Sequence, residues 1–181
     1  TGESVSPSVV EPFAPAGTGQ VYTSYIVNQA APLWKQFPYK TMGRLSFTTP
    51  NGTNYCSATN ISGNSVIVTA AHCVFNSTTN TWYSNVVFSP AFRNTSAPYG
   101  TFPAQSCWIL NTYINLTGNY AVNTWGPHDV AVCKMNKNSA GKTLAASVGW
   151  LGLTWNHSYN VHVHNNGYPF FDFNNNSIPN A

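Results

Sequence analysis

One histidine stands where a general base could be held firmly. Residues 66–69 form an apolar, β-branched run, two alanines follow, and the run ends at His72 beside Cys73. A general base has to lie within about 3 Å of the proton that it removes. A disulfide from Cys73 back to Cys56 would anchor such an imidazole and close a loop of about 16 residues, worth about 3 kcal/mol in the chain-entropy model. For a lone histidine, the alternative is structural packing near a disulfide.

A scarce carboxylate offers the partner that this imidazole would need. Asp129 is one of two aspartates in the chain and stands at the head of the apolar run 130–135. A buried carboxylate is costly unless it is paired. A carboxylate that accepts from an imidazole N–H sets the tautomer and stabilises the imidazolium, so His72 is the expected partner. The alternative is an aspartate that caps a turn before the strand.

The other histidines give weaker signals. His128 precedes Asp129, and neighbours in a strand point to opposite faces, so His128 is not expected to be the base. His162 and His164 would share one face of a strand, yet solvent-facing histidines explain this spacing better than a metal site does. We therefore predict no metal and no cofactor.

Composition excludes two classes of partner. Charged residues make up 6% of the 181 residues, against about 25% in ordinary soluble domains, and the formal net charge is +3. The basic residues are spread singly from Lys35 to Lys142. Nucleic acid binding needs a clustered basic face, so no nucleic acid partner is expected, and no membrane surface either. No apolar run reaches 18 residues, and the N-terminus lacks the regions of a signal peptide, so we expect a mature, processed N-terminus.

Cysteines and glycosylation sequons favour an extracellular location. The four cysteines, an even number, allow three pairings and favour disulfides in an oxidising compartment. Asn-x-Ser/Thr sequons suit a secreted glycoprotein, although an Asn-rich chain produces some by chance. The candidate glycosylation sites are Asn51, Asn60, Asn76, Asn94, Asn115, Asn156 and Asn175.

Short β-type runs dominate the chain after an extended N-terminal arm over residues 1–37. Turn formers separate the runs, and no helical periodicity is sustained over 12 residues, so an all-β fold is predicted. This pattern leaves open whether the strands form a barrel or a sandwich. The predicted strands are 43–49, 55–61, 65–69, 85–89, 106–110, 130–135 and 159–164.

Two motifs together resemble a known family. Thr69-Ala70-Ala71-His72-Cys73, followed by Asp129-Val130-Ala131-Val132, resembles the histidine and aspartate motifs of the chymotrypsin-like serine peptidases. The resemblance implies a double β-barrel, with His72 as the general base and Asp129 as the carboxylate that orients it. It also implies domains at 38–148, the first barrel, and 149–181, the start of the second barrel.

Further segments resemble the glutamyl-endopeptidase-like branch of secreted peptidases, over residues 37 to 170. That branch often cleaves proteins and peptides after glutamate, a preference that comes here by analogy only. Its opening hairpin, mid-barrel loop and Gly-Tyr-Pro turn are matched by Phe37-Pro38-Tyr39 with Gly43-Arg44-Leu45-Ser46-Phe47, Pro50-Asn51-Gly52 and Tyr55-Cys56-Ser57-Ala58; by Phe88-Ser89-Pro90-Ala91-Phe92 with Ala97-Pro98-Tyr99-Gly100; and by Asn166-Gly167-Tyr168-Pro169.

The serine motif of the family, Gly-Asp/Asn-Ser-Gly-Gly, does not occur in these 181 residues. The nearest string, Ser62-Gly63-Asn64-Ser65, is interpreted as a hairpin turn. We therefore expect the nucleophilic serine on a C-terminal chain cut from the same precursor, which completes the second barrel and stays bound because open sheet edges are rarely tolerated. With Cys56 and Cys73 paired, Cys107 and Cys133 are assigned to each other by elimination, most simply as a barrel staple.

Two other functions compete with a secreted serine endopeptidase. A catalytically inactive relative, serving as a binding or structural surface protein, would keep the histidine and aspartate only as inherited packing. A carbohydrate-binding β-sandwich would instead use the abundant aromatic residues, 14% of the chain, to line a groove.

Overall fold

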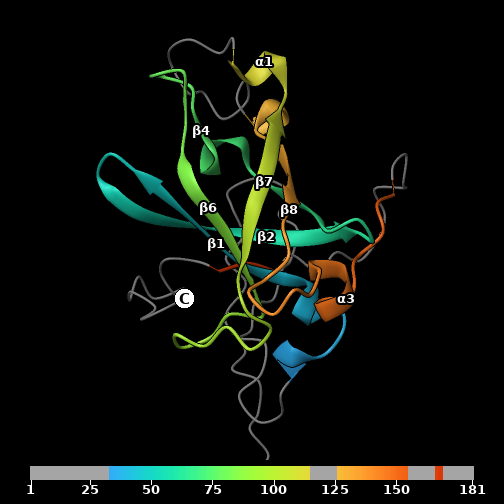
Figure 1. Ribbon diagram of the computed structural model, residues 1–181. Helices are drawn as coiled ribbons and strands as arrows, with labels where there is room; N and C mark the ends of the chain where they lie inside the picture. Colours follow the sequence, from blue (N-terminus) through green and yellow to red (C-terminus); the bar gives the residue numbers. More distant parts are fainter. Residues whose placement is uncertain (1–32, 115–125, 155–165, 169–181) are drawn as a thin grey trace, which may run out of the picture.

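The structure is a computed structural model that describes residues 33–114, 126–154 and 166–168 (Figure 1). Its centre is a closed antiparallel barrel of six strands in the order β1-β2-β3-β8-β7-β6. The predicted all-β class is confirmed, and the strands form a barrel rather than a sandwich. The strands are β1 Met42–Thr49, β2 Gly52–Ser62, β3 Val66–Thr69, β6 Ser84–Pro90, β7 Phe102–Ile109 and β8 Ala131–Met135.

Alternation of side chains fills the barrel interior. Every second residue of β8 is buried, as period-two strands require when one face meets a core. Large apolar side chains from β1, β6 and β7 meet across the interior, where they exclude water and supply the main driving force for closure. The buried strand residues of this core include Leu45, Phe47, Ile67, Phe88, Phe102, Ala131, Cys133 and Met135.

Strand β7 begins four residues before its predicted start at residue 106. Pro103 lies within the strand, where it pairs with Val87, and its carbonyl accepts from the Asn136 N–H at 2.9 Å. The missing proline N–H therefore costs this strand little, since the first residues of a strand tolerate proline. Burial of Phe102 opposite Phe88 fixes this end of the strand.

Short elements outside the barrel were not predicted. A second sheet pairs β4 Phe75–Asn76 with β5 Thr81–Trp82. Each described helix has five residues or fewer, too short for periodicity to reveal, and none of them is long and apolar enough to cross a membrane. The helices are η1 Leu33–Lys35, η2 Tyr39–Thr41, η3 Ala71–Cys73, α1 Asn111–Ile114, η4 Gly126–His128 and α3 Leu144–Val148.

Several predictions fall on residues outside the described ranges. The barrel strands all lie within the predicted 38–148 domain. Most of the predicted arm, the strand over 159–164 and most of 149–181 lie outside the described residues. The domain boundaries therefore stay predictions.

The chain leaving the barrel is tied back to strand β2 by Asn60. The Asn60 side chain is fully buried and its Nδ2 donates to the Gly149 carbonyl at 2.6 Å, while the Leu151 N–H donates to the Asn60 carbonyl at 2.9 Å. A glycan on Nδ2 would need the space and the hydrogen bond that this amide uses. The Asn60 amide is therefore inaccessible in the folded chain, whereas Asn51 and Asn94 are exposed, and the glycosylation sites stay predictions.

Packing at Gly43 yields a test of the barrel. Gly43 pairs with Pro90 between β1 and β6, and a methyl group added at Gly43 would lie 2.6 Å from Pro90 Cα. Because backbone cannot yield as a side chain does, Gly43→Ala is expected to lower the free energy of unfolding by about 3 kcal/mol. Urea denaturation measures this change.

The matched control is Gly152→Ala, since a methyl group there meets no atom within 4 Å. This substitution should change the free energy of unfolding by less than about 0.5 kcal/mol. Equal stability of the two variants would contradict the described closure of β1 on β6.

Candidate active site

A tight turn presents His72 at the surface. After β3 the chain stays extended at Ala70 and then forms the 3-10 turn η3, in which Cys73 N–H donates to the Ala70 carbonyl at 3.1 Å. Ala71 and Cys73 are buried on either side, whereas the His72 side chain is 47% exposed. The small side chains before His72 let the turn sink into the core while the imidazole points outward.

Asp129 is brought to this turn by strand pairing. Residues 126–128 form the 3-10 turn η4, and β8 begins at Ala131. Thr69 at the end of β3 is paired with Ala131 at the start of β8, so the residues just beyond each strand end lie side by side. The Asp129 side chain is 11% exposed, which makes it much less accessible to water than the imidazole.

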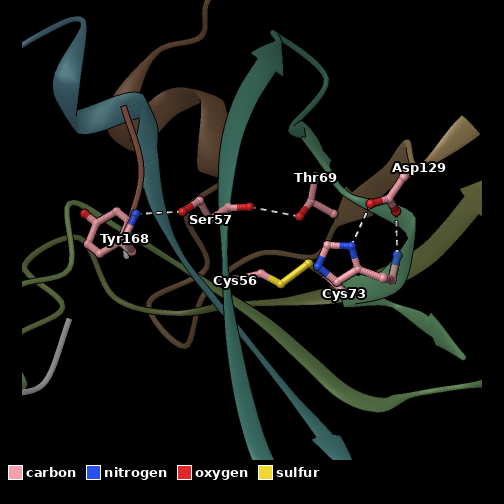
Figure 2. The surroundings of a disulfide bond; sticks show 7 residues. Cys56, Ser57, Thr69, Cys73, Asp129 and Tyr168 are labelled. Carbon is pink, nitrogen blue, oxygen red and sulfur yellow. Dashed lines mark hydrogen bonds and ion pairs between the residues drawn. A yellow bond between two sulfur atoms is a disulfide. The ribbon is translucent and has the colours of Figure 1, made fainter. Parts of the chain in front are cut away.

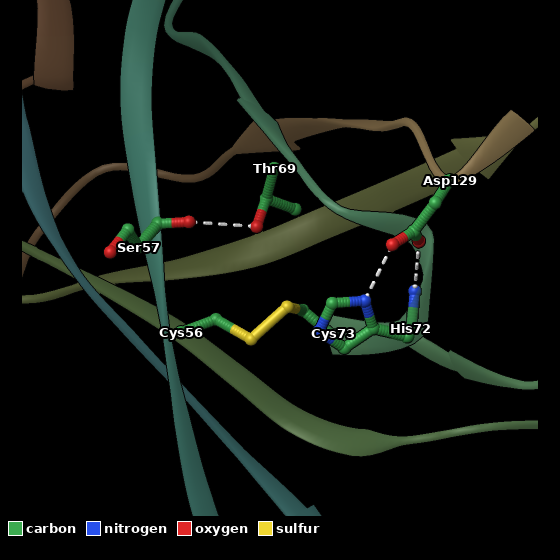
Figure 3. Close-up of polar contacts among 6 residues, drawn as sticks. All are labelled: Cys56, Ser57, Thr69, His72, Cys73 and Asp129. Atoms are coloured by element: carbon green, nitrogen blue, oxygen red, sulfur yellow. Dashed lines mark hydrogen bonds and ion pairs between the residues drawn. A yellow bond between two sulfur atoms is a disulfide. The ribbon is translucent and has the colours of Figure 1, made fainter. Parts of the chain in front are cut away.

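The Asp129 carboxylate contacts His72 twice, as Figure 3 shows. The His72 backbone N–H donates to Oδ1 at 2.9 Å, and the imidazole Nδ1 lies 2.7 Å from Oδ2. An ionised carboxylate only accepts, so Nδ1 carries the hydrogen and donates it. In the neutral imidazole this leaves the lone pair on Nε2, the nitrogen turned away from Asp129. The geometry therefore provides a base with a fixed tautomer.

A disulfide supports the other side of this turn. Cys56 of β2 is bonded to Cys73 with the Cα atoms 6.2 Å apart, and the imidazole lies beside the bond (Figure 3). The sulfurs and an imidazole nitrogen lie within 4.8 Å of one another. Metal coordination by cysteine requires a thiolate, and both sulfurs here are oxidised, so this group does not fit a metal site.

The second disulfide staples two barrel strands. Cys107 of β7 and Cys133 of β8 are direct partners in the register, with Cα atoms 4.1 Å apart. Cys133 is fully buried in the core, four residues beyond Asp129. The bond therefore holds neighbouring strands inside the barrel and does not touch the imidazole.

The reason given for excluding His128 has to be corrected. His128 and Asp129 were expected on opposite faces of a strand, but η4 ends at His128 and the strand begins only at Ala131. The two side chains instead have different partners, since His128 Nδ1 lies 3.0 Å from Thr112 Oγ1.

The string 62–65 forms the expected turn between β2 and β3, where Ser65 is buried and its Oγ accepts from the Ala145 N–H at 3.1 Å.

Other predicted residues are placed as follows. Asn76 Oδ1 accepts backbone hydrogen bonds from Thr78 and Thr79 at 2.9 and 3.1 Å, which forms the turn between β4 and β5. The remaining predicted residues lie outside the described ranges: His162, His164, Asn115, Asn156 and Asn175.

Sequence reasoning missed the contact of Ser57 with Tyr168 next to the disulfide. The Tyr168 N–H donates to Ser57 Oγ at 2.6 Å, and Thr69 Oγ1 donates to the Ser57 carbonyl at 2.9 Å (Figure 2). The two partners are 111 residues apart. The signals available were the adjacency of Ser57 to Cys56 and the Gly-Tyr-Pro string, and neither points to the other.

Burial changes two pKa values around Tyr168. Burial raises the pKa of the Tyr168 phenol to about 12, although a backbone hydrogen bond of Phe92 and the charge of Arg44 act in the opposite direction. Desolvation likewise lowers the pKa of the Arg44 guanidinium, partly offset by Tyr55 and Tyr168. At neutral pH the phenol is neutral and the guanidinium is charged.

The closed six-stranded barrel with an aspartate-oriented histidine at its rim defines the class of chymotrypsin-like serine proteases. The family model described as Trypsin matches residues 27–168, so the chain belongs to the trypsin family. The resemblance seen in the sequence is therefore confirmed at the level of this family. No match is found among curated proteins.

Solved structures show the same fold. The protease Anisep from Arthrobacter nicotinovorans is 28% identical, with a TM-score of 0.55, over 66% of this chain and 51% of that one. The thermostable serine protease AL20 from an extremophilic microorganism is 24% identical, with a TM-score of 0.56, over 66% and 53% of the two chains. A Glu endopeptidase is 23% identical, with a TM-score of 0.51, over 70% and 49%. This chain thus spans about half the length of these structures.

The two disulfides should have different effects on the turn that carries His72. Removing either bond by paired alanine substitution should lower stability by about 3 kcal/mol, from loops of 17 and 26 residues. Only Cys56→Ala with Cys73→Ala should also speed hydrogen exchange of the residue 73 and Val74 amides, which bond within the turn.

Cys107→Ala with Cys133→Ala is the matched control, and it should leave these two amides protected. The measurement is amide hydrogen exchange below the unfolding transition. Equal acceleration in both double variants would show that the Cys56–Cys73 bond does not hold the turn.

Proposed function

We propose that this chain is part of a secreted serine endopeptidase and supplies its general base, His72, and its orienting carboxylate, Asp129. The observation that carries the proposal is the double contact of Asp129 with His72, which directs Nδ1 at the carboxylate and turns Nε2 away from it. Membership of the trypsin family supports the same reaction class. The nucleophilic serine comes from polypeptide outside these 181 residues, and the substrate is a protein or peptide.

In the proposed reaction, the serine hydroxyl attacks the carbonyl carbon of the scissile peptide bond while His72 Nε2 takes its proton. The carboxylate of Asp129 stabilises the imidazolium that forms. His72 then gives the proton to the leaving amine, the C–N bond breaks, and an acyl-enzyme remains. Water attacks the ester by the same route in reverse, with His72 as the base, and releases the acid and the serine.

Exposure of the imidazole favours an enzyme over an inactive relative. A histidine kept only for packing would be expected in the interior with its ring surrounded. Here the ring is the exposed member of the pair and the carboxylate is the protected one. A base that must reach an incoming hydroxyl needs this arrangement, because proton transfer requires contact at about 3 Å.

The proposal also includes secretion of the protein. All four cysteines are paired in disulfides, and structural disulfides persist in oxidising compartments. Among the predicted glycosylation sites that the structure describes, Asn51 and Asn94 are exposed and Asn76 is half-buried. The supply of the serine by a separately cut C-terminal chain stays a prediction.

Fluorophosphonate labelling of the purified protein, followed by intact mass analysis and peptide mapping, tests the proposed function. The label should fall on a serine within a Gly-x-Ser-Gly segment outside these 181 residues, and His72→Ala should abolish labelling. Intact masses show whether that segment is in a separate chain. Absence of label from the complete wild-type protein would support the inactive surface protein instead.

Asp129→Asn in the complete protein should lower kcat by about 10⁴, because an amide favours the wrong imidazole tautomer and cannot stabilise the imidazolium. The neighbouring substitution His128→Ala is the control, since His128 bonds to Thr112 and not to the pair. Steady-state hydrolysis of a peptide substrate measures both variants. Near wild-type turnover of Asp129→Asn would refute the role of Asp129.

A further inference from the structure

Residues 166–168 return to the barrel at one point on strand β2. The Tyr168 N–H donates to Ser57 Oγ at 2.6 Å. Gly167 packs so closely that a methyl group on it would lie 3.0 Å from the same oxygen. Ser57 is thus a point on strand β2 at which the backbone of this segment is held by a directional bond.

A stacked group of side chains on β1, β2 and the chain after β6 lies near Tyr168. Arg44 pairs with Ser57 across β1 and β2, and its guanidinium lies over the rings of Tyr55 and Phe92, 4.3 and 3.4 Å from their centroids. The half-buried Tyr168 phenol has a hydrogen bond with the Phe92 backbone and lies within the field of Arg44. Cation–aromatic stacking of this kind makes a firm platform.

The same serine is connected to the support of His72. Ser57 follows Cys56, which is bonded to Cys73 beside the imidazole. The Ser57 carbonyl also accepts from Thr69 Oγ1, three residues before His72 (Figure 2). One strand residue therefore contacts both the support of the base and the segment expected to begin the second barrel.

We propose that Ser57 is a positioning residue, which fixes residues 166–168, and the second barrel that they lead into, relative to His72. The proposal rests on the proposed function, in which a serine outside this chain must meet His72 Nε2. An error of about 1 Å in such an approach can cost about 10²-fold in rate. Ser57 acts through Tyr168 and does not touch the substrate.

Ser57→Ala in the complete protease removes the acceptor of the Tyr168 N–H. We expect kcat and the rate of fluorophosphonate labelling to fall at least about tenfold, with KM changed by less than about twofold, because geometry and not substrate binding is lost. Exchange of the Tyr168 amide should accelerate. Ser57→Thr keeps the hydroxyl and should restore kcat, the labelling rate and the protection of the Tyr168 amide.

Two further variants sharpen the test. Ser46→Ala, which removes another outer-face serine bond of the barrel, from Ser46 Oγ to the Val87 carbonyl, should leave kcat unchanged. Tyr168→Ala keeps the N–H that donates to Ser57 but removes the phenol that reaches Phe92 and Arg44, so it should lower kcat through a separate contact, and the double variant should lose more than either single variant.

Wild-type kcat with a protected Tyr168 amide in Ser57→Ala would overturn the proposal, as would a loss that Ser57→Thr does not restore. An unlabelled complete wild-type protein would instead overturn the proposed function and with it the positioning role. Amide exchange would still show in that case whether Ser57 holds Tyr168.

Discussion

The pairing of β3 with β8 is the constraint on which the rest of the site depends. Neither strand carries a catalytic side chain. Strand β3 ends just before the turn that carries His72, and strand β8 begins just after Asp129. Because Thr69 lies opposite Ala131, two turns from distant parts of the chain meet at one rim of the barrel. A slip of one residue would exchange the faces of a strand and separate the pair, so the buried core also fixes the distance between His72 and Asp129.

Protection from water is divided unequally within this pair. The carboxylate is held by two donors and is mostly covered, whereas the ring that it orients is open to solvent. Fixed donors around a carboxylate hold it in place without any movement during the reaction. The barrel thus supplies a pre-oriented base, and the disulfide of Cys73 limits the freedom of the turn that carries it.

The sequence was informative where the signal is local. Short β-type runs between turn formers predicted the strands around Leu45 and Phe88, and the scarcity of aspartates singled out Asp129. Sequence-based prediction failed where tertiary contacts determine the structure. Strand β7 extends past a proline because Phe102 is buried opposite Phe88. The contact between Ser57 and Tyr168 joins residues 111 positions apart, and no periodicity or spacing encodes such a pair. The short helices were not predicted for the same reason, because packing and capping rather than sequence periodicity determine them.

Asn60 has a consequence for the biogenesis of the protein. An enzyme can reach the Asn60 sequon only before the chain folds. In the folded chain the amide is fully buried and donates to the Gly149 carbonyl. In any compartment that attaches sugars to nascent chains, strand formation therefore competes with the transferase for this one side chain.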